Sequence, residues 1–251
     1  MTVHGWDLGW LTLAAAGAGA VNAVVGSGSL ITFPALIAMG YPPVLATVSN
    51  NVGLVPGMGG AVYGYRRELT GQGPLLRRLA AAAGGGALIG SLLLLRLPSA
   101  WFRTVVPVLI GAACVLVLVQ PVLARRPAAG RRRGGAWLPF GVFATGIYGG
   151  YFGAAQGVVL IGLLGASTTE HLQRLNAVKN ALALTVNLVA AIVFTAFTSV
   201  DWRVAVLVAA GSTVGGLLGS RYGRLLPPTA LRCAIAAIGL LAMADLILGS
   251  R

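Results

Sequence analysis

The only lysine of this chain, Lys179, lies inside an apolar segment, in the run NAVKNALALTVNLVAA. An ammonium group is costly to bury in a bilayer, and an ionisable residue inside a membrane-spanning segment marks a candidate functional site. Glu170 lies nine residues earlier, and no acid lies within the helical turn that follows Lys179. An anionic ligand is therefore one candidate partner for the ammonium group. The alternative is that the side chain extends to the membrane surface.

Two interrupted segments carry the other polar groups that could bind a ligand. The first begins at the Gly/Ser loop of VVGSGSLITFPALIAMGYPP and continues into ATVSNN, and the second runs from YFGAAQGVVL into QRLNAVKN. Glycines let backbone N–H groups approach a ligand, and a helix that starts at such a break points its positive dipole end at an anion. Each group also has a structural interpretation, because small residues allow close helix packing and Asn side chains cap helices or bond between them. The predicted substrate-binding residues are Gly26, Ser27, Gly28, Ser29, Thr47, Ser49, Asn50, Asn51, Gln156, Gly157, Asn176, Lys179 and Asn180.

Catalysis is not predicted from these residues. A serine nucleophile requires a neighbouring base, and the sequence offers none beside Ser27 or Ser29. His4 and His171 do not form a metal-binding set, and of the five acids only Asp245 lies inside an apolar run. We therefore expect no catalytic residue, metal or cofactor, and a membrane-embedded enzyme is the less favoured alternative.

The composition places the chain in a lipid bilayer. It is 57% hydrophobic and 9% charged, whereas a soluble domain carries about 25% charged residues. The apolar runs are continuous rather than alternating, which predicts helices and not the strands of a membrane barrel. The fold class is therefore an all-α integral membrane protein. The net charge of +13 comes from arginines in short loops, which indicates contact with lipid headgroups rather than with nucleic acid.

The apolar runs predict about eight transmembrane helices and two short, broken segments. The short segments, 30–39 and 158–164, are below the roughly 20 residues that a spanning helix needs. Residues 1–124 are predicted to form a first transmembrane repeat, 125–135 a basic cytoplasmic linker and 136–251 a second repeat. The predicted spans are 8–25, 44–65, 79–97, 104–123, 136–151, 175–197, 204–219 and 230–248.

The two repeats resemble each other in sequence. GALIGS recurs 129 residues later as GGLLGS, and the same shift pairs Asn51 with Asn180. Upstream, Gly26 pairs with Gly153 at a shift of 127 residues. Internal duplication of this kind is typical of transporters, whose sites are built from broken helices at the interface of the repeats. The sequence therefore predicts two related four-helix halves, each with one short helix near its glycine-rich motif.

Arginine distribution predicts the orientation. The loop 66–78 and the linker hold nine arginines and lie two spans apart, so both are expected in the cytoplasm. Eight spans would place both termini there as well. The loops 96–103 and 221–232 are also basic but would face outward, which conflicts with this arrangement.

The paired motifs resemble a known family. VVGSGSLITFPALIAMGYPP with ATVSNN, and YGGYFGAAQGVVLIGLLG with QRLNAVKNALAL, are similar to the two halves of sulfite exporter TauE/SafE-type permeases, also called the toluene sulfonate uptake permease family. The resemblance covers nearly the whole chain. It departs from the commonest family pattern where GSGS replaces a run of glycines and where the second half reads GAAQG.

The resemblance implies a multi-pass permease of the bacterial inner membrane that moves small sulfur-containing or organic anions. The duplicated broken segments predict alternating access by rocking of one half against the other. Sulfur oxyanions and organosulfonates, such as sulfite and sulfoacetate, are the expected substrates. Proton coupling is a further expectation, for which Lys179, Asp245 and Tyr148 are the few candidate titratable groups. A passive anion channel, a carboxylate carrier on the same fold and a structural membrane subunit are the alternatives. The sequence assigns no oligomeric state.

Overall fold

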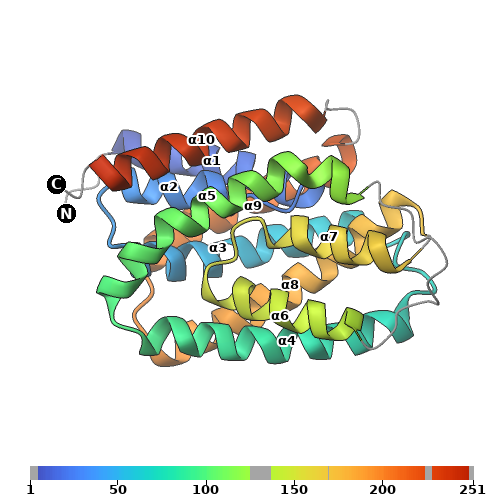
Figure 1. The fold of residues 1–251 in the computed structure, drawn as a ribbon. Coiled ribbons are helices and arrows are strands. Elements are labelled where there is room, and N and C mark those ends of the chain that lie inside the picture. Colours follow the sequence, from blue (N-terminus) through green and yellow to red (C-terminus); the bar gives the residue numbers. More distant parts are fainter. Residues whose placement is uncertain (1–4, 125–136, 169, 224–227, 249–251) are drawn as a thin grey trace.

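A computed structural model describes residues 5–124, 137–168, 170–223 and 228–248 (Figure 1). All regular structure in these residues is helical, which confirms the predicted all-α class. The predicted linker 125–135 lies outside the described residues. The helices are α1 (Gly5–Val24), α2 (Ser29–Ala38), α3 (Pro43–Gly64), α4 (Gly73–Arg96), α5 (Ser99–Ala124), α6 (Trp137–Tyr151), α7 (Gln156–Ser167), α8 (Leu172–Phe197), α9 (Trp202–Tyr222) and α10 (Pro228–Leu248).

Glycines end the helices at the predicted breaks. Gly26 separates α1 from α2 with a φ of +87°, and Gly153 separates α6 from α7 with a φ of +78°. Glycine adopts this left-handed conformation without the steric cost that a side chain would add. The two positions that pair in the sequence repeat therefore make the same kind of chain reversal.

Four of the described helices are long and apolar enough to cross a membrane: α4, the Thr104–Pro121 part of α5, α8 and α9. α2 and α7 are shorter, with 10 and 12 residues. A helix rises about 1.5 Å per residue, so each short helix spans roughly half of a hydrocarbon core about 30 Å thick.

α1, α3 and α9 pack side by side in parallel. Glycines in these helices bring the backbones close together. In successive contacts the residue numbers increase along both partner helices, so the helices run parallel. Because α1 and α3 both run parallel to α9, the intervening α2 returns the chain to the side on which α1 began. α1 and α2 therefore form a re-entrant hairpin. The contacts are Gly211–Thr12, Gly215–Ala16 and Gly219–Ala20 for α1, and Gly53–Val208, Gly57–Ser212 and Gly64–Ser220 for α3.

α4, α6 and α8 form a second parallel group by the same arrangement. Since α6 and α8 both run parallel to α4, α7 returns the chain and completes a second hairpin with α6. Figure 1 shows α7 beginning in the middle of the molecule and running back to the end at which α6 starts. The contacts are Gly86–Phe143, Gly90–Ile147 and Gly150–Ala87 for α6, and Gly71–Arg174 and Gly84–Val189 for α8.

The hairpins determine how often the chain changes sides. α1–α2 adds no net crossing, so α3, α4 and α5 make three crossings before the second hairpin, and α8, α9 and α10 make three after it. Because three crossings, an odd number, separate the two hairpins, the second half of the chain has the opposite orientation across the membrane to the first. The start of α1 and the end of α10 consequently lie at one end of the molecule, opposite the turn 65–72 (Figure 1). This differs from the predicted placement of both termini beside the basic loops, which counted α1 and α6 as full crossings.

Cysteine labelling tests this topology. In a variant without Cys114 and Cys233, we expect Thr70→Cys and Ser199→Cys to react with an impermeant maleimide from opposite sides of the membrane, because an odd number of crossings separates the two turns. Pro42→Cys is the control and should react from the same side as Ser199→Cys. Labelling of Thr70→Cys and Ser199→Cys from one side would contradict the hairpin arrangement.

Two glycines of α3 test the packing against α9. A Cβ on Gly57 would lie 2.5 Å from the Ser212 carbonyl oxygen, whereas a Cβ on Gly59 meets nothing within 4 Å. We expect Gly57→Ala to destabilise the protein by about 1–3 kcal/mol, because the helices must separate. Gly59→Ala is the matched control and should leave the melting temperature in detergent unchanged or slightly raised. Equal melting temperatures for both variants would refute the close packing.

Candidate functional site

The tips of the two hairpins meet inside the protein. The Gly157 amide, in the first turn of α7, donates a hydrogen bond of 3.1 Å to the Gly26 carbonyl between α1 and α2. A Cβ on Gly26 would lie 2.6 Å from the Gly157 Cα, and a Cβ on Gly157 would lie 2.6 Å from the Gly26 Cα. Only glycine at both positions allows this approach, so the two predicted glycine motifs are brought together.

Asn22 holds the first tip in place. Its Oδ1 accepts a 2.7 Å hydrogen bond from the Gly28 amide, across the turn that joins α1 to α2. A Cβ on Gly28 would lie 2.8 Å from the Asn22 Cγ. Sequence reasoning did not select Asn22, although an amide four residues before the Gly/Ser loop was a usable signal.

Lys179 is completely buried, and its ammonium group contacts the end of α1. Its Nζ lies 3.2 Å from the Asn22 carbonyl oxygen and 3.3 Å from that of Ala23, and Asn180 Nδ2 donates to the Ala23 carbonyl at 3.1 Å. The last carbonyls of a helix lack intrahelical partners and carry its negative dipole end, which a cation stabilises. The side chain therefore does not extend to the membrane surface in this structure. It joins α8 to the first hairpin.

Several buried polar atoms lack a hydrogen-bond partner among the described residues. Five belong to predicted site residues, and none of these side chains is more than 9% exposed: Ser27 Oγ, Asn50 Oδ1, Asn51 Oδ1, Gln156 Oε1 and Asn176 Oδ1. Buried polar groups in proteins almost always find partners, so each of these atoms is a candidate contact for a ligand or water. The other atoms of this kind are Asn22 Nδ2, Thr32 Oγ1 and Gln173 Oε1.

An amide pair joins the two halves where α3 meets α8. Asn51 Nδ2 donates to Asn187 Oδ1 at 2.7 Å, and Asn187 Nδ2 lies 2.7 Å from the Met58 sulfur. Asn187 follows Asn180 by seven residues, two helical turns, so both lie on one face of α8. Sequence reasoning missed Asn187 because it lies in the middle of an apolar run.

Two predicted site residues have structural contacts away from the tips. Thr47 Oγ1 donates to the Pro43 carbonyl one helical turn earlier at 2.9 Å. Ser49 Oγ accepts from the Asp201 amide at 2.9 Å, at the turn between α8 and α9. Burial, reinforced by the nearby Asp201 carboxylate, raises the pKa of Tyr41 at this end of the molecule. The structure thus places Thr47 and Ser49 in contacts that hold the start of α3.

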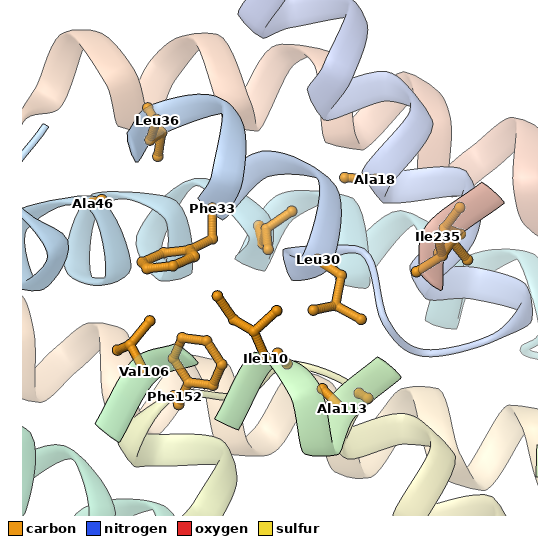
Figure 2. Packing of buried hydrophobic residues seen from close by; sticks show 14 of the residues in the cluster. Ala18, Leu30, Phe33, Leu36, Ala46, Val106, Ile110, Ala113, Phe152 and Ile235 are labelled. Atoms are coloured by element: carbon orange, nitrogen blue, oxygen red, sulfur yellow. The ribbon is translucent and has the colours of Figure 1, made fainter. Parts of the chain in front are cut away.

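Apolar packing anchors both tips. Phe152 follows α6 directly, and its ring makes edge contacts with Phe33 of α2 at 5.3 Å and Phe102 of α5 at 6.2 Å between centroids. Figure 2 shows Phe33 and Leu30 of α2 facing Ile110 of α5, with Phe152 beside them. The polar atoms at the tips are therefore bordered by an apolar core on the side of α5.

A charged side chain also supports the first tip. Gln120 Nε2 lies 3.5 Å from the Val25 carbonyl, and Gln120 Oε1 accepts from Arg232 Nε at 3.0 Å. Neither residue was selected from the sequence. In the described part of the chain no group of three or more His, Cys, Asp or Glu side chains could hold a metal ion.

Comparisons with known proteins identify the family of this chain. The family description "Sulfite exporter TauE/SafE" matches residues 11–246, so the chain belongs to this family. It is 28% identical over 225 residues to the probable membrane transporter protein YfcA of Escherichia coli K12, which covers 85% of this chain and 80% of YfcA.

Two further relatives match over longer stretches. A probable membrane transporter protein of Haemophilus influenzae is 27% identical over 237 residues, covering 90% of this chain and 89% of that protein. The probable membrane transporter protein ORF9 of a Sinorhizobium species is 29% identical over 252 residues, covering 94% and 92%. No solved structure matches. Together with the four long apolar helices, family membership identifies an integral membrane protein.

A double-mutant cycle tests the amide pair. We expect Asn51→Leu and Asn187→Leu each to lower stability, because each leaves the other amide buried without its partner. The double variant should lose less stability than the two single variants lose together. The difference, the coupling energy, is expected to be about 0.6–1.7 kcal/mol, the range of interhelical hydrogen bonds in membranes. Unfolding of all four proteins in detergent measures the coupling, and strictly additive losses would contradict the bond.

Proposed function

We propose that this protein is a membrane transporter that binds a small anion where the two hairpin tips meet. The observation that carries the proposal is the buried ammonium group of Lys179, held at the first tip, where the Ser27 hydroxyl is also buried without a partner. The relatives named as probable membrane transporters support the transporter class.

The charges favour an anion. Among the side chains that the structure describes, Lys179 is the only charged one that is fully buried. The carboxylates of Glu68, Glu170 and Asp201 lie in the connections between helices, away from the tips. An ammonium group has three N–H donors, and two contact the carbonyls of Asn22 and Ala23. The third is available to a ligand.

Neutral groups would complete the binding site. The unpartnered atoms are the Ser27 hydroxyl and the amide oxygens of Asn50, Gln156 and Asn176. The hydroxyl can donate to an anion, whereas an amide donates only through its NH2 group and must turn that group toward the ligand. α2 and α7 begin at the tips, so their positive dipole ends favour an anion there. The glycines would let the backbone approach the ligand, as at the discontinuous helices of other transporters.

Alternating access would come from movement between two groups of helices. α1 and α3 pack on α9, and α6 and α8 pack on α4, so each group combines helices from both predicted repeats. The complete burial of Lys179 corresponds to a closed conformation. Many transporters consist of inverted repeats and change access by switching between two related packing arrangements. The two hairpins of this chain enter from opposite sides, which supports the predicted duplication.

For the substrate we propose a sulfur oxyanion or organosulfonate, such as sulfite or sulfoacetate, which the family description supports. A carboxylate carrier and a passive anion channel are the alternatives. We place the protein in the inner membrane of a bacterium, and we propose proton coupling as a property to test by imposing a pH gradient.

Transport by proteoliposomes tests the site. We expect saturable uptake of one sulfur oxyanion from a panel of sulfite, sulfoacetate, thiosulfate, sulfate and small carboxylates, with and without a pH gradient. Lys179→Gln keeps an N–H donor but removes the charge, so we expect it to lower uptake at least tenfold, while Lys179→Arg retains part of it. Thr185→Val is the control on α8, because its hydroxyl bonds only within the helix.

The loss of uptake must be separated from a loss of folding, because Lys179 also stabilises the end of α1. Melting temperatures are therefore measured for every variant, and Asn50→Ala provides a second probe that removes no hydrogen bond between described residues. We expect it to raise the KM for the anion. Unchanged uptake by a stably folded Lys179→Gln variant would refute the anion site. Selective uptake of carboxylates by the unaltered protein would show that carboxylates, and not sulfur oxyanions, are the substrates.

A further inference from the structure

A cleft of about 780 Å³ lies where α3 and α9 end, outside the hairpin site. Three arginines line it: Arg66 and Arg67, which follow α3, and Arg221 in the last turn of α9. Tyr63 and Tyr222 lie beside them. Glu68 is the only acid in the lining, so positive charge predominates in the cleft.

Aromatic rings position two of the guanidinium groups. The Arg66 Cζ lies 4.1 Å from the ring centroid of Tyr63, and the Arg221 Cζ lies 5.4 Å from that of Tyr222. Arg66 uses one N–H to bond the Tyr63 carbonyl at 2.9 Å, which is the usual capping of a helix C-terminus by a cation. Capping accounts for that single bond. It does not account for three guanidinium groups around one shared cleft, whose forked donors suit a phosphate group.

The cleft also has an apolar wall. Leu217 and Leu218 of α9 line it and are 41% and 51% exposed, and Tyr63 is 60% exposed. In a membrane such leucines face acyl chains, and tyrosines lie at the level of the headgroups. Guanidinium groups above an exposed aliphatic wall suit a ligand with an anionic head and an apolar tail. A soluble anion would leave that wall without a partner.

We propose that this cleft binds the phosphate headgroup of an anionic phospholipid, with an acyl chain along Leu217 and Leu218. The same end of the molecule carries Arg77 and Arg78 in the second turn of α4, so the positive-inside rule places it at the cytoplasmic leaflet, where anionic lipids attract basic segments. The bound lipid would join the ends of α3 and α9, two helices of one packing group.

Lipid binding by the purified full chain tests the proposal. Native mass spectrometry counts the phosphatidylglycerol and phosphatidylcholine molecules retained after exchange from mixed micelles. We expect a preference for phosphatidylglycerol that falls about fivefold for each arginine removed, the effect of one basic residue near an anionic surface. The double variant Arg66→Gln, Arg221→Gln should therefore lose most of the preference.

The matched control is Arg77→Gln, Arg78→Gln, which removes the same charge from exposed residues at the same end but outside the cleft. It should change the preference less than twofold. An equal loss in both double variants would overturn the proposal, as would equal retention of the two lipids by the unaltered protein. Displacement of phosphatidylglycerol by millimolar inorganic phosphate would assign the cleft to a soluble anion instead.

Discussion

The backbone contact between Gly26 and Gly157 is the constraint on which the rest of the structure depends. Two hairpins that enter from opposite ends can meet in the interior only if no side chain separates their tips. The meeting interrupts α1–α2 and α6–α7 inside the protein, and it buries backbone groups at helix ends. Exposed backbone groups at such depth require partners from the protein. The polar residues around the tips follow from this requirement.

Lys179 has a structural role in the fold and a second role in the proposed mechanism. Its ammonium group stabilises the free carbonyls at the end of α1, which compensates part of the cost of burying a charge. The same contact fixes a positive charge at the tip, where the proposed anion would bind. A ligand that draws the ammonium group away from α1 would loosen the first hairpin, so binding and hairpin position are physically linked in the proposed mechanism.

The helices around the tips form two parallel groups, which meet where α8 packs against α3. Within each group, glycines place backbones in direct contact and leave little freedom to slide. Between the groups, α3 and α8 meet through the Asn51–Asn187 amide pair, a polar contact that can be exchanged at modest cost. The basic cleft lies at the end of one group, where the proposed lipid headgroup would contact the ends of α3 and α9 together.

The sequence by itself determined the membrane class, the all-helical fold, the positions of the breaks and most of the polar residues at the tips. These features depend on composition and local spacing, because apolar length and glycine conformation act within a few residues. Only the tertiary structure decided that α1–α2 and α6–α7 are hairpins, that Thr47 and Ser49 bond elsewhere, and that Asn22, Gln120 and Asn187 support the site. It also decided that the partner of Lys179 is a helix end some 156 residues away. Such contacts form between segments distant in the chain, and no local pattern specifies which carbonyl an ammonium group will meet.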